Sequence, residues 1–143
     1  MKLVTVWRKW SILAPEYAPG RCNIGRRGRV IRLATGLILI VFSIILGITV
    51  LNPENRLFSL VLVITFYVGF LAGLEGSMSF CVLHAARGTY DLNEPHGFAS
   101  RKSGTLAKVR SEDWKGLDRR KASVMHFEAL SGAVLLALLL AFS

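Results

Sequence analysis

The chain of 143 residues contains 18 Lys+Arg and 9 Asp+Glu, which gives a formal net charge of +9 at pH 7. Such a charge often indicates a polyanionic partner, but 52% of the residues are hydrophobic and no nucleic-acid-binding motif accompanies the basic residues. We therefore exclude nucleic acid as the expected partner and favour a membrane.

An amphipathic interfacial segment is expected over residues 1–20. Apolar side chains, Trp7 and Trp10 among them, recur at helical spacing on one face, polar and basic side chains occupy the other, and Pro15 ends the pattern. A basic amphipathic helix with two tryptophans suits a membrane interface. Docking against a protein partner explains the same pattern equally well.

Long apolar runs dominate the rest of the chain. Residues 33–51 and 57–74 are nineteen and eighteen residues without a charge, joined by an Asn-Pro-Glu-Asn turn signal. Because a hydrocarbon core of about 30 Å needs roughly 20 helical residues, these runs predict a helical hairpin across a membrane. Residues 122–143, interrupted only by His126 and Glu128, predict a third span. The expected fold class is an all-α membrane protein with three transmembrane helices and the N-terminal interfacial helix.

Basic residues flank these spans unevenly. Residues 1–32 contain eight Lys/Arg and residues 75–121 contain nine, whereas the turn at 52–56 contains only Arg56. Since positive flanks stay on the cytoplasmic side, we expect a multi-pass inner-membrane protein with a cytoplasmic N-terminus and the C-terminus at the outer, periplasmic face. Membrane lipids, anionic ones included, are the expected partners of the interfacial residues Arg21, Arg26, Arg27, Arg29, Arg32, Trp7, Trp10 and Trp114.

A polar loop over residues 90–121 separates the hairpin from the third span, and its sequence has no strand alternation. Ser111 and the acidic residues after it form a helix-start signal. We expect this short helix to lie along the membrane surface and to lead into the third span.

Small residues indicate where helices touch, because lipid gives helices no hydrophobic reason to associate. Gly69 and Gly73 form a G-x-x-x-G in the second span, and a row of alanines recurs every fourth residue in the third. The expected helix-packing residues are Gly69, Gly73, Ala129, Ala133, Ala137 and Ala141.

Short motifs recur around the hairpin: Asn23, Gly25, Arg29, Arg32, Gly36, Phe80, Cys81 and Leu83. On these motifs, residues 21–89 resemble the YgaP-like transmembrane domain, a small two-helix membrane module of unknown function. The chain departs from the family pattern at Gly28, where Asp is usual, at Val82, where Pro is usual, and at His84, where Tyr is usual. The resemblance implies that this part is a two-helix module and does not extend to the third span.

Two cysteines, Cys22 and Cys81, are brought to the same interface by the hairpin and are the candidate redox residues. Packing is the commoner role of thiols with apolar neighbours. Cys81 and His84 could also supply half of a metal site, but a closed site needs four ligands, so we predict no metal.

Two histidines are candidate cofactor ligands. His126, with the small Ala122 four residues before it, matches the way membrane helices ligate a haem or chlorophyll-type pigment, and His84 is the second candidate. His126 and Glu128 also lie near Arg119, Arg120 and Lys121, so a position in the head-group region or an ion pair explains them at less cost. No cofactor is therefore predicted, although the pigment alternative stays open.

No nucleophile and base, carboxylate pair or phosphate-binding loop is recognisable, so we do not expect an enzyme. The expected function is a non-catalytic accessory or structural subunit of a larger integral-membrane complex, with other membrane subunits or a second copy as partners. A small redox or sulfur-handling membrane protein that uses Cys22 and Cys81 is the alternative, and a pigment- or haem-ligating subunit is the second alternative.

Overall fold

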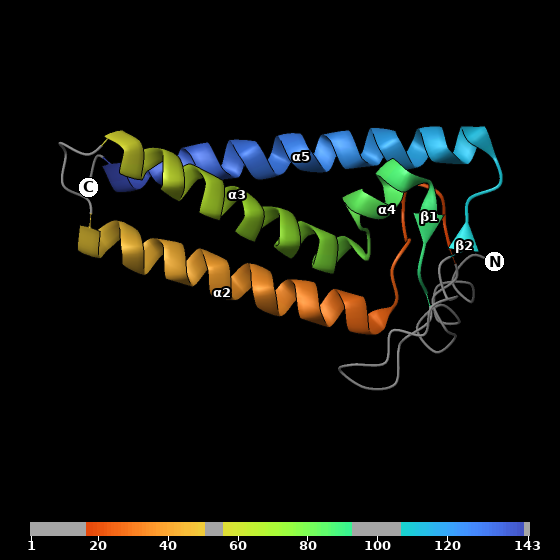
Figure 1. Cartoon of the computed structure of the whole chain (residues 1–143), viewed down its shortest axis with the longest axis horizontal. Coiled ribbons are helices and arrows are strands. Elements are labelled where there is room, and N and C mark those ends of the chain that lie inside the picture. Colours follow the sequence, from red (N-terminus) through yellow and green to blue (C-terminus); the bar gives the residue numbers. More distant parts are fainter. Residues whose placement is uncertain (1–16, 51–55, 93–106, 142–143) are drawn as a thin grey trace, which may run out of the picture.

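A computed structural model describes residues 17–50, 56–92 and 107–141 of the chain (Figure 1). Most of the expected interfacial segment, with Trp7 and Trp10, lies outside the described residues. The elements in chain order are α2 (Arg26–Val50), α3 (Arg56–Met78), α4 (Val82–Arg87), β1 (Thr89–Tyr90), β2 (Ala107–Lys108) and α5 (Glu112–Ala141).

Three of these helices are long and apolar enough to cross a membrane: the segments Arg26–Thr49, Val61–Met78 and Glu112–Leu140. Figure 1 shows α3 between α2 and α5, with α4 and the short strands gathered at one end. We call this end, where α2 and α5 begin and α3 ends, the polar end. The expected fold class of an all-α, three-span membrane protein is confirmed.

The helices extend further toward the polar end than the apolar runs predicted. α2 begins at Arg26, and α5 begins at Glu112 and continues to Ala141 as one helix of 30 residues. The helix start after Ser111 is therefore correct, but the expectation that this part lies along the membrane surface is wrong, because it continues the axis of the third span (Figure 1).

A small sheet, which the sequence did not predict, closes the polar end. Thr89 and Tyr90 of β1 pair antiparallel with Lys108 and Ala107 of β2. A parallel bridge joins Ile24 to Asp91. Strands of two residues are too short to show alternation, so only the fold around them could reveal this pairing.

Glycines allow α2 and α3 to touch through their backbones. A Cβ atom on Gly36 would lie 2.6 Å from the Gly73 nitrogen and 2.7 Å from the Gly69 carbonyl oxygen. A Cβ atom on Gly76 would lie 2.7 Å from the Leu33 nitrogen. Gly69 and Gly76 of α3 therefore lie against α2 of the same chain, and Gly36 of α2 lies against the backbone of Gly69 and Gly73; a Cβ atom on Gly73 itself would meet nothing within 4 Å.

The alanines of α5 are also used within the chain. Ala129 and Ala133 are fully buried, and Ala133 packs with Leu62 and Phe66 of α3. Ala137 is partly buried against the same cluster, and the side chain of Ala141 is outside the described part. The small-residue rows thus join the three helices of this chain to one another, and a partner would have to dock on other faces.

Candidate functional site

The chain reverses at the polar end through a left-handed residue after α3. Ser79 has φ +56°, the Phe80 N–H donates to the Glu75 carbonyl at 3.0 Å, and Phe80 is fully buried. This is the six-to-one hydrogen bond of a Schellman cap, with Ser79 at the position that glycine usually occupies. The cap presents the Ser79 carbonyl to the segment before α2, where the Asn23 N–H donates to it at 3.1 Å.

Asn23 ties the start of α2 to the end of α3. Its side chain is fully buried, its Nδ2 donates to the Cys81 carbonyl at 2.9 Å, and its Oδ1 accepts the Cys81 N–H at 2.6 Å. The backbone of Asn23 also accepts the Asp91 N–H at 3.0 Å. The amide side chain therefore satisfies both backbone groups of Cys81, and the side chain and backbone of Asn23 together join three segments.

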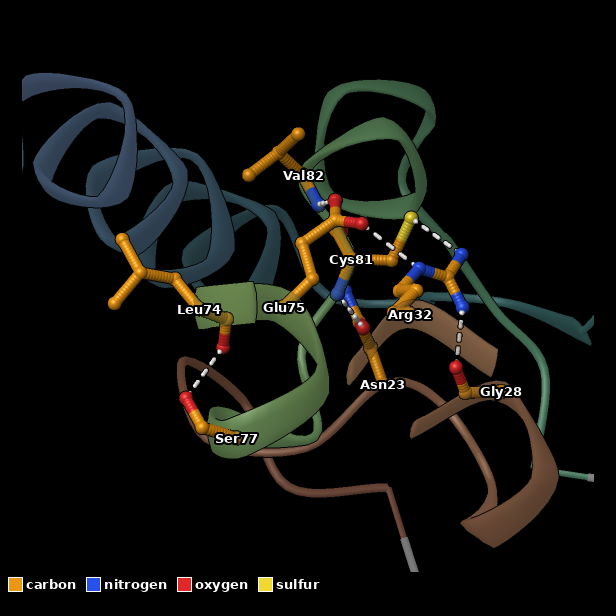
Figure 2. Close-up of polar contacts among 8 residues, drawn as sticks. All are labelled: Asn23, Gly28, Arg32, Leu74, Glu75, Ser77, Cys81 and Val82. Carbon is orange, nitrogen blue, oxygen red and sulfur yellow. Dashed lines mark hydrogen bonds and ion pairs between the residues drawn. The ribbon is translucent and has the colours of Figure 1, made fainter. Parts of the chain in front are cut away.

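Arg32 lies at the centre of a polar cluster between α2 and α3 (Figure 2). Its guanidinium donates to the Glu75 carboxylate at 2.8 Å, to the Gly28 carbonyl at 3.2 Å and to the Cys81 sulfur at 3.2 Å. Glu75 is buried, and its second oxygen accepts the Val82 N–H at 2.8 Å, which satisfies the start of α4. The cluster has complementary charges and filled hydrogen bonds, which is the arrangement of a structural joint.

The five arginines near α2 therefore differ in their surroundings. Arg21 and Arg26 are exposed, and Arg29 is exposed while its Nε donates to the Gly76 carbonyl at 3.2 Å. Arg27 and Arg32 are partly buried. Arg32, which the sequence predicts at the lipid interface, has Glu75 as its main partner, an acid that the sequence pattern did not single out.

A second joint links the segment before α2 to α5. Asp118 is fully buried and accepts from the Tyr17 hydroxyl at 2.9 Å and from the Gly20 N–H at 2.7 Å. The Tyr17 ring stacks on Tyr90 at a centroid distance of 4.5 Å and lies 6.1 Å from Trp114. Burial, reinforced by the bond to Asp118, raises the pKa of Tyr17 far above its usual value. Trp114 is 47% exposed, so it both contacts this joint and remains at the surface.

The candidate redox cysteines have surroundings that suit packing. Cys81 is 3% exposed and its thiol is in contact with Arg32. Cys22 is partly buried, its thiol donates to the Ile24 carbonyl at 3.6 Å, and burial raises its pKa, which disfavours the reactive thiolate. Among the described residues, no group of three or more His, Cys, Asp or Glu side chains could hold a metal ion.

His84, the second candidate ligand, belongs to α4 at the polar end. Its Nδ1 lies 3.0 Å from the Thr89 hydroxyl. Burial and, next, the nearby Arg32 lower the pKa of His84, so the ring is held neutral at ordinary pH. Its contacts position β1 after α4, whose last turn is closed by Gly88 in the left-handed conformation.

His126 lies deeper in the bundle than the sequence suggested. Its Nδ1 is 2.6 Å from the hydroxyl of Tyr67, a residue near the middle of α3. His126 follows Asp118 by eight residues, and Tyr67 precedes Glu75 by eight, so the pair lies about 12 Å inside the level of the two polar joints. Tyr67 and His126 both lie well inside the helix segments long and apolar enough to cross a membrane, Val61–Met78 and Glu112–Leu140, whereas the sequence placed His126 near the start of the third span.

A groove between α3 and α5 opens beside this pair. It has a volume of about 290 Å³ and is lined by Val63, Ile64, Tyr67, His126, Phe127 and Leu130. Ile64 and Phe127 are 61% and 73% exposed, so the groove opens on the outside of the bundle. It is an apolar groove with one imidazole and one hydroxyl, both on helix segments long and apolar enough to cross a membrane.

Glu128 lies on the other side of α5. It follows His126 by two residues, which corresponds to a rotation of about 200° around the helix. Its side chain is exposed and makes no hydrogen bond or ion pair with another described residue. An ion pair with Arg119, Arg120 or Lys121, one of the two explanations offered for Glu128, is therefore not found in the described structure; the other, a position in the head-group region, stays a prediction.

No protein-family model, curated protein or solved structure matches the chain. Four of the residues that carry the YgaP-like resemblance lie in one joint, whereas Leu83 is exposed. Asn23, Arg29, Arg32 and Cys81 make the contacts of the first polar joint, and Gly36 lies at the crossing of α2 and α3. In this chain the motif forms a structural joint of the hairpin.

Sequence reasoning missed several residues of these sites: Tyr17, Tyr67, Glu75 and Asp118. Two of them had a detectable signal, because Glu75 is an acid directly after an apolar run and Asp118 is an acid next to Arg119, Arg120 and Lys121. Tyr67 had none, since an aromatic residue within a span is ordinary.

Proposed function

We propose that the chain is a non-catalytic accessory subunit of a larger integral-membrane complex, and that it docks through the outer face of α5 around Glu128. The observation that carries this proposal is an exposed carboxyl group, without a partner in the described structure, on a helix long and apolar enough to span a membrane. An ionisable residue within a span is a functional hypothesis by default.

The surroundings of Glu128 support a docking face. Val124, Ser131, Leu135 and Leu139 follow the same side of α5 at spacings of three and four residues, and all are exposed. This set, with Glu128, is the Glu128 face. It combines apolar side chains with two polar ones, a composition that suits close contact with another helix bearing a hydrogen-bond donor.

The energetics favour a partner over lipid. An acidic residue at the centre of a span costs about 2.5 to 3.5 kcal/mol on insertion scales. Glu128 follows Lys121, the last basic residue of α5, by seven residues or about 10 Å. A donor from a second subunit, or from a second copy of this chain, would offset that cost. The small-residue rows do not serve this contact, because they are used inside the chain.

The proposal includes an orientation and a lipid environment. In the described structure, the basic residues lie at the polar end except for Arg56 at the start of α3. By the positive-inside rule we place the polar end, and hence the N-terminus, in the cytoplasm and the end of α5 at the outer face of an inner membrane. Exposed Arg21 and Arg26 would then contact anionic lipid head groups.

Membership of the YgaP-like family is part of the proposal for residues 21–89. It is supported by the way the motif residues make the joint between α2 and α3. A thiol function has less support, because Cys81 is almost fully buried and the pKa of Cys22 is raised.

The test is the assembly state after gentle solubilisation. The wild-type chain is expected to co-purify with other subunits or as a dimer, measured by native mass spectrometry. Glu128→Leu should shift the chain toward the monomer, because the polar contact with the partner is lost. Leucine is itself compatible with lipid, so the helix should still insert. Asp113→Leu, which removes another exposed acid from α5 near its start, is the control and should assemble normally. A monomeric wild-type chain, or normal assembly of Glu128→Leu, would refute the proposal.

A further inference from the structure

His126, in the groove between α3 and α5, has a ring nitrogen that can donate a hydrogen bond to a ligand. The Tyr67 hydroxyl has one acceptor within hydrogen-bond distance among the described residues, the Nδ1 of His126 at 2.6 Å. A hydroxyl at hydrocarbon depth is costly without an acceptor, so the O–H of Tyr67 donates to Nδ1. Nδ1 then carries the lone pair, and the ring proton is on Nε2.

This tautomer selects the kind of ligand. Nε2–H has no acceptor among the described residues, and His126 is one of the residues that line the groove. A metal of a haem or chlorin needs a lone pair at this nitrogen, and providing it would leave the Tyr67 hydroxyl without its acceptor. The ligand must instead present an oxygen acceptor to Nε2–H.

Depth and size restrict the ligand further. The pair lies well inside the candidate membrane spans Val61–Met78 and Glu112–Leu140, whereas the ester carbonyls of phospholipids belong to the interfacial region. The groove volume of about 290 Å³ is just below the range of about 300 to 1,000 Å³ typical of small-molecule sites, which suits one substituted ring and not a macrocycle. Its other lining residues, Val63, Ile64, Phe127 and Leu130, are apolar.

We propose that this groove binds the head group of a membrane quinone, with His126 Nε2–H donating to one of its carbonyl oxygens and Tyr67 holding the imidazole in place. A quinone is a small apolar ring with carbonyl acceptors and an apolar tail, and it is soluble in the hydrocarbon. The site is independent of the proposed docking through Glu128, which lies on the opposite side of α5.

The experiment measures uptake of decylubiquinone by the full chain in phosphatidylcholine nanodiscs, in excess of its partition into empty nanodiscs. Saturable uptake near one molecule per chain is expected. Decylbenzene, which has the same tail and no carbonyl groups, should show no saturable excess. Equal uptake of the two compounds, or no excess of the quinone, would overturn the proposal.

Two substitutions of His126 separate donation from folding. His126→Asn keeps a polar atom close to the position of Nδ1 for Tyr67 but removes the donor at Nε2, and should weaken quinone binding about tenfold. His126→Gln keeps a donor near the position of Nε2 and should bind more tightly than His126→Asn. His84→Asn, the same change at the polar end, is the control with normal binding. Quinone binding that is unchanged in His126→Asn would refute the assignment of His126 as the donor. Binding of haemin by the wild-type chain that is lost in His126→Asn would refute it as well.

Discussion

Asn23 provides a quantitative test of the polar end, because its fully buried amide satisfies both backbone groups of Cys81. In Asn23→Ala, the Cys81 carbonyl keeps its bond from the Ala85 N–H at 3.1 Å, whereas the Cys81 N–H loses its partner. One orphaned donor costs about 1 to 3 kcal/mol, and the second lost bond adds about 1 kcal/mol. We expect the polar end to become less stable by about 2 to 4 kcal/mol.

Cys81 is 3% exposed, so its thiol can report on this change. Maleimide labelling at neutral pH, in a Cys22→Ser background, measures how often the polar end opens. If labelling proceeds through local opening, the loss of about 2 to 4 kcal/mol of stability in Asn23→Ala corresponds to a labelling rate about 30- to 700-fold higher. Thr49→Ala, which removes an exposed hydroxyl bonded only within α2, is the control and should label at the parental rate. A rate for Asn23→Ala within twofold of the parent would refute the reasoning.

Three further predictions concern other parts of the chain. Gly36→Ala should lower the free energy of unfolding in detergent by about 1 to 3 kcal/mol, because the new Cβ would meet backbone atoms of α3. Gly73→Ala should leave it unchanged, because a Cβ there meets nothing within 4 Å. Equal losses of stability in the two variants would contradict this. Tyr17 should stay protonated at pH 10 in an absorbance titration. The free energy of unfolding should fall as the pH rises above the usual tyrosine pKa of 10.0, because the unfolded state then loses a proton that the folded state keeps. Tyr17→Phe should remove this alkaline loss of stability. Because the pKa of His84 is lowered in the folded state, the free energy of unfolding should fall as the pH drops below 6.5, where the unfolded state gains the proton. His84→Asn should make the stability less dependent on pH in this range. A wild-type stability that does not change with pH would contradict this.

The sequence predicted the membrane spans well because span length and charge exclusion are properties of a segment alone. The apolar runs gave the three helices, and Gly69 and Gly73 gave one side of a helix contact. The partner side could not be predicted, because Gly36 lies in α2 and only the fold shows that its missing Cβ faces Gly73. The helix ends were misjudged for a related reason. Arg29 and Arg32 extend α2 beyond the apolar run, where hydropathy gives no signal.

The candidate sites were predictable only in part. The sequence identified His126, Cys81 and Arg32, but each has a partner far away in the chain: Tyr67, Asn23 and Glu75, respectively. A hydropathy profile places His126 near the start of the third span, and only the packing of α5 against α3 shows that it lies opposite the middle of α3. The roles of these residues depend on such long-range contacts, which a periodic pattern does not encode.

The central claim, docking through the Glu128 face, is tested most directly by photocrosslinking in native membranes. A benzophenone amino acid at Leu135, 61% exposed on that face, is compared with the same group at Ile38, 66% exposed on α2. We predict a discrete protein adduct from position 135, lost when Glu128→Leu is added, and adducts with lipid alone from position 38. Adducts with lipid alone from both positions would contradict the account.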